Sequence, residues 1–288
     1  MGEYHSEIEP GAIDSILFAI VTYGEKFWEC KSFLSLQDSF SHAKINSNLK
    51  VFIVDNTEIP DWRLQVPEFN NIDIFYFHDE TNGGISCAYN RAGDYAIHNK
   101  LKWLVFLDQD TDLPQDFVQK YLTVAINNKQ AKVFVPKIYS GGKIVSPSFY
   151  INFRSIPIEK QLPDFLDLTD VSFINSGMLI AVDLFEKVGG YDRNLRIDFC
   201  DHSFVERIRT EVGKVGIIDL ALNQNFSFNE FDFEKAVRRY SLFLKDFKAY
   251  RNSKKNKLTL FYNVDLRHLL KLSVKYKSLR FLRQRLQF

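Results

Sequence analysis

The 288-residue sequence predicts a doubly wound α/β domain followed by a basic helical extension. Three observations support this fold class: apolar strands alternate with helices, acidic residues follow several strands, and basic residues concentrate near the C-terminus. Continuous Val/Ile/Phe strands separated by helices are typical of a mostly parallel sheet that is covered on both faces. Ligands of such sheets bind at the carboxyl ends of the strands.

The N-terminal half alternates regularly between the two kinds of element. Strands are expected at 15–22, 49–55, 72–79, 102–108 and 132–138, and helices at 25–43, 82–99 and 114–128. The helix at 82–99 follows a Gly-Gly turn, whose backbone N–H groups either face a phosphate or only begin the helix. Pro114 falls in the first turn of the third helix, where proline is tolerated.

The pattern changes after about residue 140. The segment GGKIVSPSFYINF predicts a hairpin at 141–153, and SFINSGMLIAV predicts another buried strand at 172–182. A short helix at 183–192 ends at paired glycines, a further helix covers 201–212, and a strand covers 214–219. From residue 232 onward the chain is expected to be helical and basic.

Composition and cysteine use indicate an ordinary globular protein. The chain is 45% hydrophobic and 25% charged, which is enough apolar material for a large core. Its three cysteines form no C-x-x-C pair, so structural zinc is not expected and a reduced, cytoplasmic setting is favoured. The polar start MGEYHSEIEP does not resemble a signal peptide, and no apolar run reaches transmembrane length.

The formal net charge of +1 hides a strong division of charge along the chain. Residues 235–288 contain 16 Lys+Arg against two acidic residues, whereas the remainder contains 21 basic and 34 acidic residues. Such asymmetry indicates an anionic partner for the tail, either a membrane or a nucleic acid. The sequence is therefore divided into a domain at 1–230 and a basic helical extension at 231–288.

The most informative stretch is WLVFLDQDTDLP at 103–114, where an apolar strand runs into three aspartates. Asp108 and Asp110, at i and i+2 on a strand end, can converge on one small site. Carboxylates so close together repel unless a cation lies between them, and oxygen ligands of this kind suit Mg²⁺ or Mn²⁺. The alternative is a solvated acidic turn, and Asp112 is better interpreted as a cap of the next helix.

A second acidic cluster precedes the helix at 201–212. Asp198 and Asp201 stand just before its amphipathic stretch. Asp201 either caps this helix or faces the strand-end site, where an ionised carboxylate beside an acceptor hydroxyl could act as a general base.

The order of the motifs VTYG, VDN, NGGISCAYNRAG, FLDQDT, FINSGMLI, GGYDRNLRID and DHSFVERIR resembles family-2 glycosyltransferases of the GT-A fold. The sequence is most similar to the bacterial rhamnosyltransferase and galactofuranosyltransferase-like branch, over roughly residues 15–230. In that branch the D-x-D motif is typically written L-D-Q-D-S/T, and Asp198, Asp201 and Arg207 match a second motif of the branch.

The resemblance implies a role for each matching position. Nucleotide binding is implied for Thr22, Tyr23, Asp55, Asn82, Gly83, Asn90 and Asp108. The acceptor side would be formed by Ser176, Gly177, Asp198 and Arg207. Asp110 would bind Mn²⁺ or Mg²⁺ on the diphosphate, with Asp108 in contact through a water. Asp201 matches the catalytic base, so the anomeric configuration would invert. Many relatives carry a metal-binding His after the last strand, where this chain has Gln224 or a neighbouring Asn, and this weakens the expected hold on the ion.

The resemblance also implies the substrates and the setting. The donor would be dTDP-rhamnose, UDP-galactofuranose or UDP-galactose, and the acceptor a growing lipid-linked polysaccharide such as O-antigen or capsule. The basic tail at 235–288 lies outside the resemblance. Its pattern can place Leu266, Leu269, Leu270 and Leu272 near one side of a helix and Arg267, Lys271 and Lys275 on another, and such a basic amphipathic segment would lie on an anionic inner leaflet. Alternatively, these helices pack on the body or form a dimer.

Two other functions compete with this interpretation. A sugar-phosphate nucleotidyltransferase also uses a doubly wound sheet and Mg²⁺, but it needs a glycine-rich basic loop that VTYGEKFWECK lacks. A non-enzymatic module that binds membrane or nucleic acid would leave both acidic clusters without a role, and no nucleic-acid partner is expected.

Overall fold

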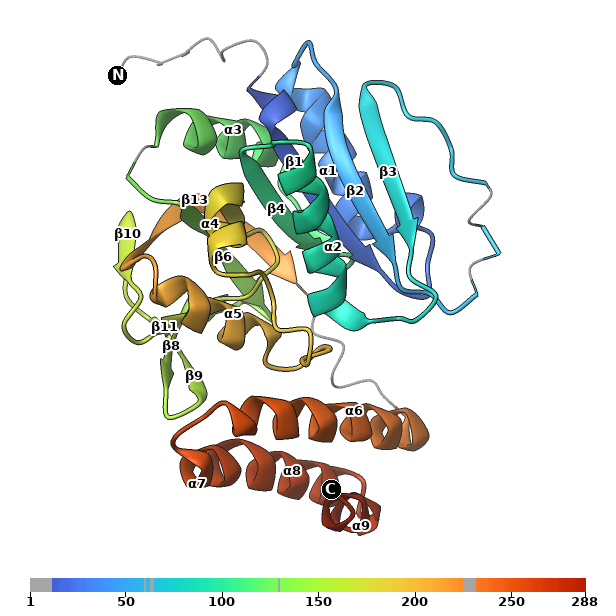
Figure 1. Cartoon of the computed structure of the whole chain (residues 1–288), viewed down its shortest axis with the longest axis vertical. Helices are drawn as coiled ribbons and strands as arrows, with labels where there is room; N and C mark the ends of the chain where they lie inside the picture. The colour runs from blue at the N-terminus through green and yellow to red at the C-terminus, as the bar shows by residue number, and fades with distance from the viewer. Residues whose placement is uncertain (1–11, 60, 63–64, 129, 225–231) are drawn as a thin grey trace.

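The computed structural model describes residues 12–59, 61–62, 65–128, 130–224 and 232–288. The polar segment 1–10 and the expected boundary at 230/231 lie outside the described residues. Within them, ten strands form one central sheet (Figure 1). Its order is β10-β13-β6-β12-β4-β1-β2-β3, with β5 attached to β13 and β7 to β6. The bounds are β1 Ile16–Thr22, β2 Leu49–Asp55, β3 Ile72–His78, β4 Trp103–Asp108, β5 Thr111–Asp112, β6 Val133–Ser140, β7 Lys143–Ser146, β10 Phe165–Asp167, β12 Leu179–Ala181 and β13 Lys214–Gln224.

The first four long strands are parallel, as predicted. β1 pairs in parallel with β2 and β4, and β2 pairs in parallel with β3. β12 runs antiparallel between β4 and β6, and β6 is parallel to β13. The sheet is therefore mostly parallel with antiparallel insertions.

Helices cover both faces of this sheet (Figure 1). α1 (Lys31–Ala43) and α3 (Phe117–Asn127) pack on one face, and α2 (Gly84–His98), α4 (Val182–Lys187) and α5 (Cys200–Arg209) pack on the other. Successive residues of a strand point to opposite faces. In β1, Leu17 and Ala19 accordingly join one core while Phe18 and Ile20 join the other. This explains the continuous apolar runs and confirms the doubly wound α/β prediction.

The hairpin predicted at 141–153 is wrong in its pairing. β7 pairs with β6, whereas β8 (Ser148–Ile151) pairs with β9 (Arg154–Pro157) in a separate sheet with β11 (Val171–Ser172). Two tight turns cause this, because Gly141-Gly142 and Asn152-Phe153 all have positive φ and each pair connects adjacent strands. Paired positive φ angles match the twist of a two-residue hairpin.

The long strand predicted at 172–182 is also wrong. Only β11 and β12 are strands there, and residues 173–178 connect them by a turn, in which the backbone of Gly177 and Met178 bonds to Phe106 of β4. Gly177 makes this turn with φ +80°, and a Cβ on it would lie 2.6 Å from Pro136 Cγ. The apolar run is buried in either geometry, so its composition could not distinguish a strand from this turn.

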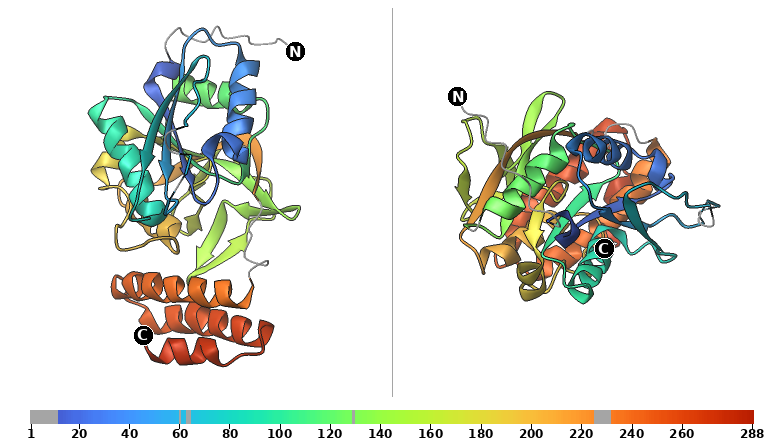
Figure 2. Two further views of the ribbon diagram at one scale, coloured as in Figure 1. Left: turned by 90° about the vertical axis from the view of Figure 1, so that its right-hand side faces the viewer. Right: turned by 90° about the horizontal axis from the view of Figure 1, so that it is seen from above.

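The C-terminal extension is helical, as predicted. It consists of α6 (Phe233–Asn252), α7 (Lys257–Leu260), a π-helical turn (Phe261–Leu266), α8 (Arg267–Lys275) and α9 (Arg280–Leu286). α6 lies between the α/β body and the remaining helices (Figure 2). Phe199 of the body stacks on Tyr250 of α6, with ring centroids 4.7 Å apart. In the described part of the chain, no helix combines the length and apolarity needed to cross a membrane.

Candidate active site

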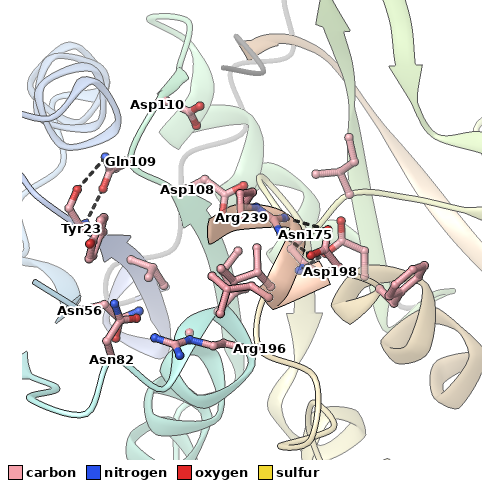
Figure 3. Close-up of a pocket in the computed structure, with 18 of the residues that line it drawn as sticks. Tyr23, Asn56, Asn82, Asp108, Gln109, Asp110, Asn175, Arg196, Asp198 and Arg239 are labelled. Atoms are coloured by element: carbon pink, nitrogen blue, oxygen red, sulfur yellow. Dashed lines mark hydrogen bonds and ion pairs between the residues drawn. The ribbon is translucent and has the colours of Figure 1, made fainter. Parts of the chain in front are cut away.

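A cavity of about 850 Å³ opens at the carboxyl ends of β1 and β4 (Figure 3). The chain leaves β1 toward β2 and β3 on one side, while β4 lies on the other. This reversal of strand order creates a crevice, which is where open α/β sheets bind ligands. The register places Val21 beside Asp108, so the ends of the first and fourth strands meet at one site.

The turn Asp108-Gln109-Asp110 is held in place by neighbouring polar groups. The Asp108 N–H donates to Ser176 Oγ at 3.1 Å, and Ser176 Oγ lies 2.6 Å from Thr111 Oγ1. Gln109 joins the turn to β1, because its Oε1 accepts from the Tyr23 N–H at 2.6 Å. The bonds from Ser176 and Gln109 therefore hold the turn in place, and the two carboxylates project from this fixed strand end.

Asp108 and Asp110 share a neutral partner, Gln224. Its Nε2 donates to Asp108 Oδ2 at 3.0 Å and to Asp110 Oδ1 at 3.3 Å, and Tyr89 OH donates to Asp108 Oδ1 at 2.7 Å. Burial raises the pKa of both carboxyls above the usual range, and Asp110 adds to the effect at Asp108. The bonds from Gln224 lower both values and only partly offset this. Gln224 thus lies against both carboxylates of the expected cation site.

The donor set at this position fits a weakly held divalent ion. Among the described residues, no group of three or more His, Cys, Asp or Glu side chains could hold a metal ion. However, Gln224 Oε1 is buried and lacks a hydrogen-bond partner within the described residues. A rotation of this amide would turn its oxygen toward the carboxylates, as a cation between them would require. Two carboxylates and one amide leave most of the coordination shell to other ligands.

Asp201 lies across the same cavity, in the first turn of α5. Asn175 Nδ2 donates to Asp201 Oδ1, and Asn175 Oδ1 accepts from Tyr191 OH at 2.7 Å. Burial, reinforced by the charges of Asp108 and Asp198, raises the pKa of Asp201 to about 8. Such a carboxyl takes up and releases a proton near neutral pH, as a general base must.

The C-terminal extension contributes part of the cavity wall. Arg238, Arg239 and Leu242 of α6 line it. Arg239 forms a bidentate ion pair with Asp198, with N–O distances of 2.5 and 2.8 Å. Arg238 is exposed and forms no ion pair with any described residue. A cation at this end suits an anionic group.

The opposite end of the cavity is polar and is formed by other loops. Tyr23, Asn56, Glu58 and Asn82 line it, and the Arg196 side chain extends toward Asn56 and Asn82 (Figure 3). Gly84 permits this approach, because a Cβ on it would lie 2.3 Å from the Arg196 carbonyl oxygen. The cavity thus joins an amide-rich end to an acidic and arginine-containing end.

The structure brings six of the predicted site residues together and leaves seven outside the cavity. Those that line it are Tyr23, Asn82, Asp108, Asp110, Asp198 and Asp201. Those that do not are Thr22, Asp55, Gly83, Asn90, Ser176, Gly177 and Arg207.

The outlying residues support the loops around the cavity. Asp55 is buried, and its carboxylate accepts from the Thr57 N–H, Trp62 Nε1 and Tyr76 OH. Asn90 bonds both backbone groups of Tyr191, and Arg207 donates to the Gly190 carbonyl at 3.0 Å. Both therefore hold the Gly-Gly turn that precedes the acidic loop.

Sequence reasoning missed several lining residues. Asn175 and Arg196 lie inside quoted motifs, so their proximity to Ser176 and Asp198 was an available signal. Asn56 directly follows Asp55 and could have been found in the same way. Arg238, Arg239 and Leu242 carried no such signal, because only long-range packing brings α6 to the cavity.

The fold is of the GT-A type. The chain belongs to glycosyl transferase family 2, whose family model matches residues 18–189. A dTDP-rhamnosyl transferase from Shigella flexneri, RfbF, is 28% identical over 164 residues. These residues are 54% of this chain and 52% of that protein, so the chain spans about half of this relative's length.

Solved structures share the fold at low sequence identity. TarS of S. aureus, residues 1–349, aligns with 95% of this chain and 72% of its own, at TM-score 0.56 and 15% identity. GalNAc-T7, solved with UDP, GalNAc and Mn²⁺, aligns with 87% of this chain and 56% of its own, at TM-score 0.57 and 12% identity. The mannosyltransferase PcManGT from Pyrobaculum calidifontis, solved with GDP-Man and Mn²⁺, aligns with 85% of this chain and 68% of its own, at TM-score 0.52 and 14% identity.

A Gln224→Glu substitution tests the cation-binding capacity of the acidic pair. A third carboxylate there would replace hydrogen bonds with repulsion, so the free energy of unfolding in EDTA at pH 8 should fall by about 2 kcal/mol. Mn²⁺ should restore it, with a larger stabilisation than in the unaltered protein. Urea denaturation measures both effects. Asn223→Asp adds the same charge on the exposed side of β13 and should respond little to Mn²⁺; an equal response of both variants would contradict the prediction.

Proposed function

We propose that the protein is an inverting glycosyltransferase that moves a sugar from a nucleotide donor to a growing lipid-linked surface polysaccharide. The observation that carries this proposal is Asp201, whose pKa is raised to about 8 and which faces the same cavity as Asp108 and Asp110. The similarity to a dTDP-rhamnosyl transferase favours dTDP-rhamnose among the three candidate donors. O-antigen and capsule chains are the proposed acceptors.

The cavity supports a single in-line displacement. The nucleotide would occupy the end formed by Tyr23, Asn56 and Asn82, and the diphosphate would lie toward Asp108 and Asp110. Asp201 would remove the proton from the acceptor hydroxyl as its oxygen bonds to the anomeric carbon. The bond from that carbon to the diphosphate oxygen would break on the opposite side, so the nucleoside diphosphate leaves and the configuration inverts.

Negative charge develops on the leaving diphosphate and must be stabilised. A divalent ion, Mn²⁺ or Mg²⁺, bound by Asp110 and by Asp108 through a water, would supply this charge stabilisation when present. Arg196 has no ion pair within the described residues and extends into the nucleotide end. Arg196 would therefore assist the ion at the diphosphate.

Replacement of Asp201 tests the base. Asp201→Asn should lower kcat by about 10²- to 10⁴-fold, because it removes the proton acceptor, while nucleotide affinity stays within about twofold. In the unaltered enzyme, kcat should rise with pH and level off above a midpoint near 8, since only the ionised carboxylate accepts the proton. Steady-state kinetics across the pH range measures both. A variant that keeps more than about a tenth of the activity would exclude Asp201 as the base.

Nucleotide binding provides a test that needs no acceptor. Thermal-shift measurements with dTDP, UDP and their sugars should show stabilisation, which reaches about 2.7 kcal/mol at a hundredfold excess over Kd. Mn²⁺ should enlarge the shift, and Asp110→Ala should abolish only this metal-dependent part. Asp112→Ala, an exposed neighbour, is the control. If no nucleotide stabilises the unaltered protein, the proposed function fails; if Asp110→Ala responds fully to Mn²⁺, the metal assignment fails.

We also propose that the outer face of the C-terminal helices binds an anionic membrane, which would place the protein peripherally on the cytoplasmic leaflet. This outer face is defined by exposed apolar and basic residues of α7 to α9 and the turns between them. They are Leu258, Tyr262, Arg267, Leu270, Lys271, Val274, Lys275, Lys277, Leu279, Leu282, Arg283 and Leu286.

One expectation about these helices is wrong. Leu269 is buried, but Leu270 is 54% exposed and lies on the outer face with the basic residues. Apolar and basic side chains therefore share one surface, which suits the headgroup boundary of an anionic bilayer. The exposed Phe149, Ile151 and Ile156 of the β8–β9 hairpin extend the apolar character next to these helices (Figure 2).

Charge reversal on α8 tests the membrane proposal. Each surface lysine contributes about 1 kcal/mol to binding at an anionic surface, so Lys271→Glu/Lys275→Glu should weaken binding at least about 30-fold. Co-sedimentation with phosphatidylcholine vesicles, with and without phosphatidylglycerol, measures this effect. Lys44→Glu/Lys100→Glu makes the same charge change at the opposite edge of the sheet and should bind normally. Equal binding by the two double variants, or oligomers that form through this face, would contradict the proposal.

A further inference from the structure

A buried carboxylate of the C-terminal extension binds the backbone of the acidic loop. Asp246 of α6 is only 2% exposed, although it is charged. Its Oδ1 accepts from the Arg196 N–H at 3.0 Å, and its Oδ2 accepts from the Ile197 and Asp198 N–H groups, both at 2.8 Å. Three consecutive N–H groups directed at one carboxylate form an anion-binding concavity, here closed by a residue of the same chain.

Two further contacts join α6 to the same loop. Arg239 pairs with Asp198 in the bidentate arrangement that fixes geometry as well as charge. Phe199 has φ +64°, a left-handed conformation that is costly for a bulky residue, and its ring stacks on Tyr250 of α6. The surrounding contacts must therefore hold residues 196–199 in a shape that the loop would not adopt unaided.

The loop lies directly before the proposed base. Asp201 is three residues after Asp198, in the first turn of α5, so the path of residues 196–199 decides where this turn begins. On the nucleotide side, the Ile85 N–H donates to the Arg196 carbonyl at 2.8 Å. The loop is thus fixed between the start of α2 and the middle of α6, and α6 provides the only carboxylate among the described residues that accepts its three N–H groups.

We propose that Asp246 is a positioning residue for catalysis, which makes the C-terminal extension a necessary part of the active site. It holds residues 196–198 so that Asp201 faces the acceptor hydroxyl and Asp198 meets Arg239. The inference rests on the proposed role of Asp201 as the base. A placement error of about 1 Å in a reacting group is enough to lower a rate by about 100-fold.

The test compares Asp246→Asn with Asp265→Asn in the full-length protein. Asp265 is a second buried acid of the extension, but it pairs with Arg285 and lies away from the loop. In Asp246→Asn an amide N–H₂ replaces one acceptor oxygen and opposes the loop N–H groups. We expect kcat to fall by about 100-fold, because the released loop no longer holds Asp201 in place; since the loop also carries Arg196, the donor KM should rise as well. The midpoint of the kcat–pH profile should also move below 8 as Asp201 becomes more solvated.

Hydrogen exchange tests the contact between Asp246 and the backbone N–H groups of residues 196–198, and it needs no substrate. Amides 196–198 should exchange at least about ten times faster in Asp246→Asn than in the unaltered protein, and Asp265→Asn should leave them protected. All kinetics are measured at the same interval below each variant's melting temperature. Arg239→Lys, which keeps the charge but loses the bidentate geometry, provides a milder second variant if Asp246→Asn does not fold.

The outcomes separate this inference from the proposed function. If the unaltered protein transfers no sugar, the proposed function fails, while the exchange experiment still decides whether Asp246 holds the loop. If transfer occurs but Asp246→Asn keeps kcat within about threefold and its pH midpoint, the positioning role is overturned. An equal loss of kcat in Asp265→Asn would show general destabilisation of the extension and would also overturn it.

Discussion

The structure depends on how it stabilises several carboxylates in and around one cavity. Each has a different kind of partner. Asp108 receives bonds from Tyr89 and Gln224, Asp201 is bonded by Asn175, Asp198 is paired with Arg239, and Asp246 accepts three backbone N–H groups. A buried carboxylate is stable only when such bonds replace water. These partners come from α2, β13, the turn before β12, the loop 196–198 and α6, so the bonds to the acids fix the relative positions of these elements.

The kind of partner also determines what each acid can do. Asp198 is bonded by the guanidinium of Arg239 and Asp246 by three backbone N–H groups, so both acids hold the loop. Asp201, Asp108 and Asp110 are instead bonded by neutral side-chain amides. The acids that are proposed to bind a cation or exchange a proton are therefore those with neutral, replaceable partners, although burial raises the pKa of Asp246 as well as those of these three acids.

The sequence predicted the parts that depend on local pattern. The strands that carry Asp55 and Asp108 are continuous apolar runs because both of their faces are covered, and this signal is visible without any partner. The turn at 173–178 was missed because its residues are as apolar as a strand, and Gly177 alone marked the change. The hairpins were missed because two positive-φ turns, rather than strand composition, decide which strands pair. The roles of Arg239 and Asp246 could not have been predicted, because no local sequence pattern indicates that α6 packs against the loop at 196–198.

α6 connects the acidic body to the basic outer helices, because it contacts the body with one face and the outer helices with the other. One face meets the body through Arg239, Asp246 and Tyr250, while Tyr240 and Phe243 contact His268 of α8 on the side of the outer helices. Ten of the 16 basic residues of 235–288 lie beyond α6, on the outer helices and the turns between them. Membrane binding and loop positioning are therefore proposed for different surfaces of the extension. Charge reversal on α8 should leave kcat for a water-soluble acceptor unchanged, since no residue of that face reaches the loop, and loss of the Asp246 carboxylate should leave vesicle binding unchanged.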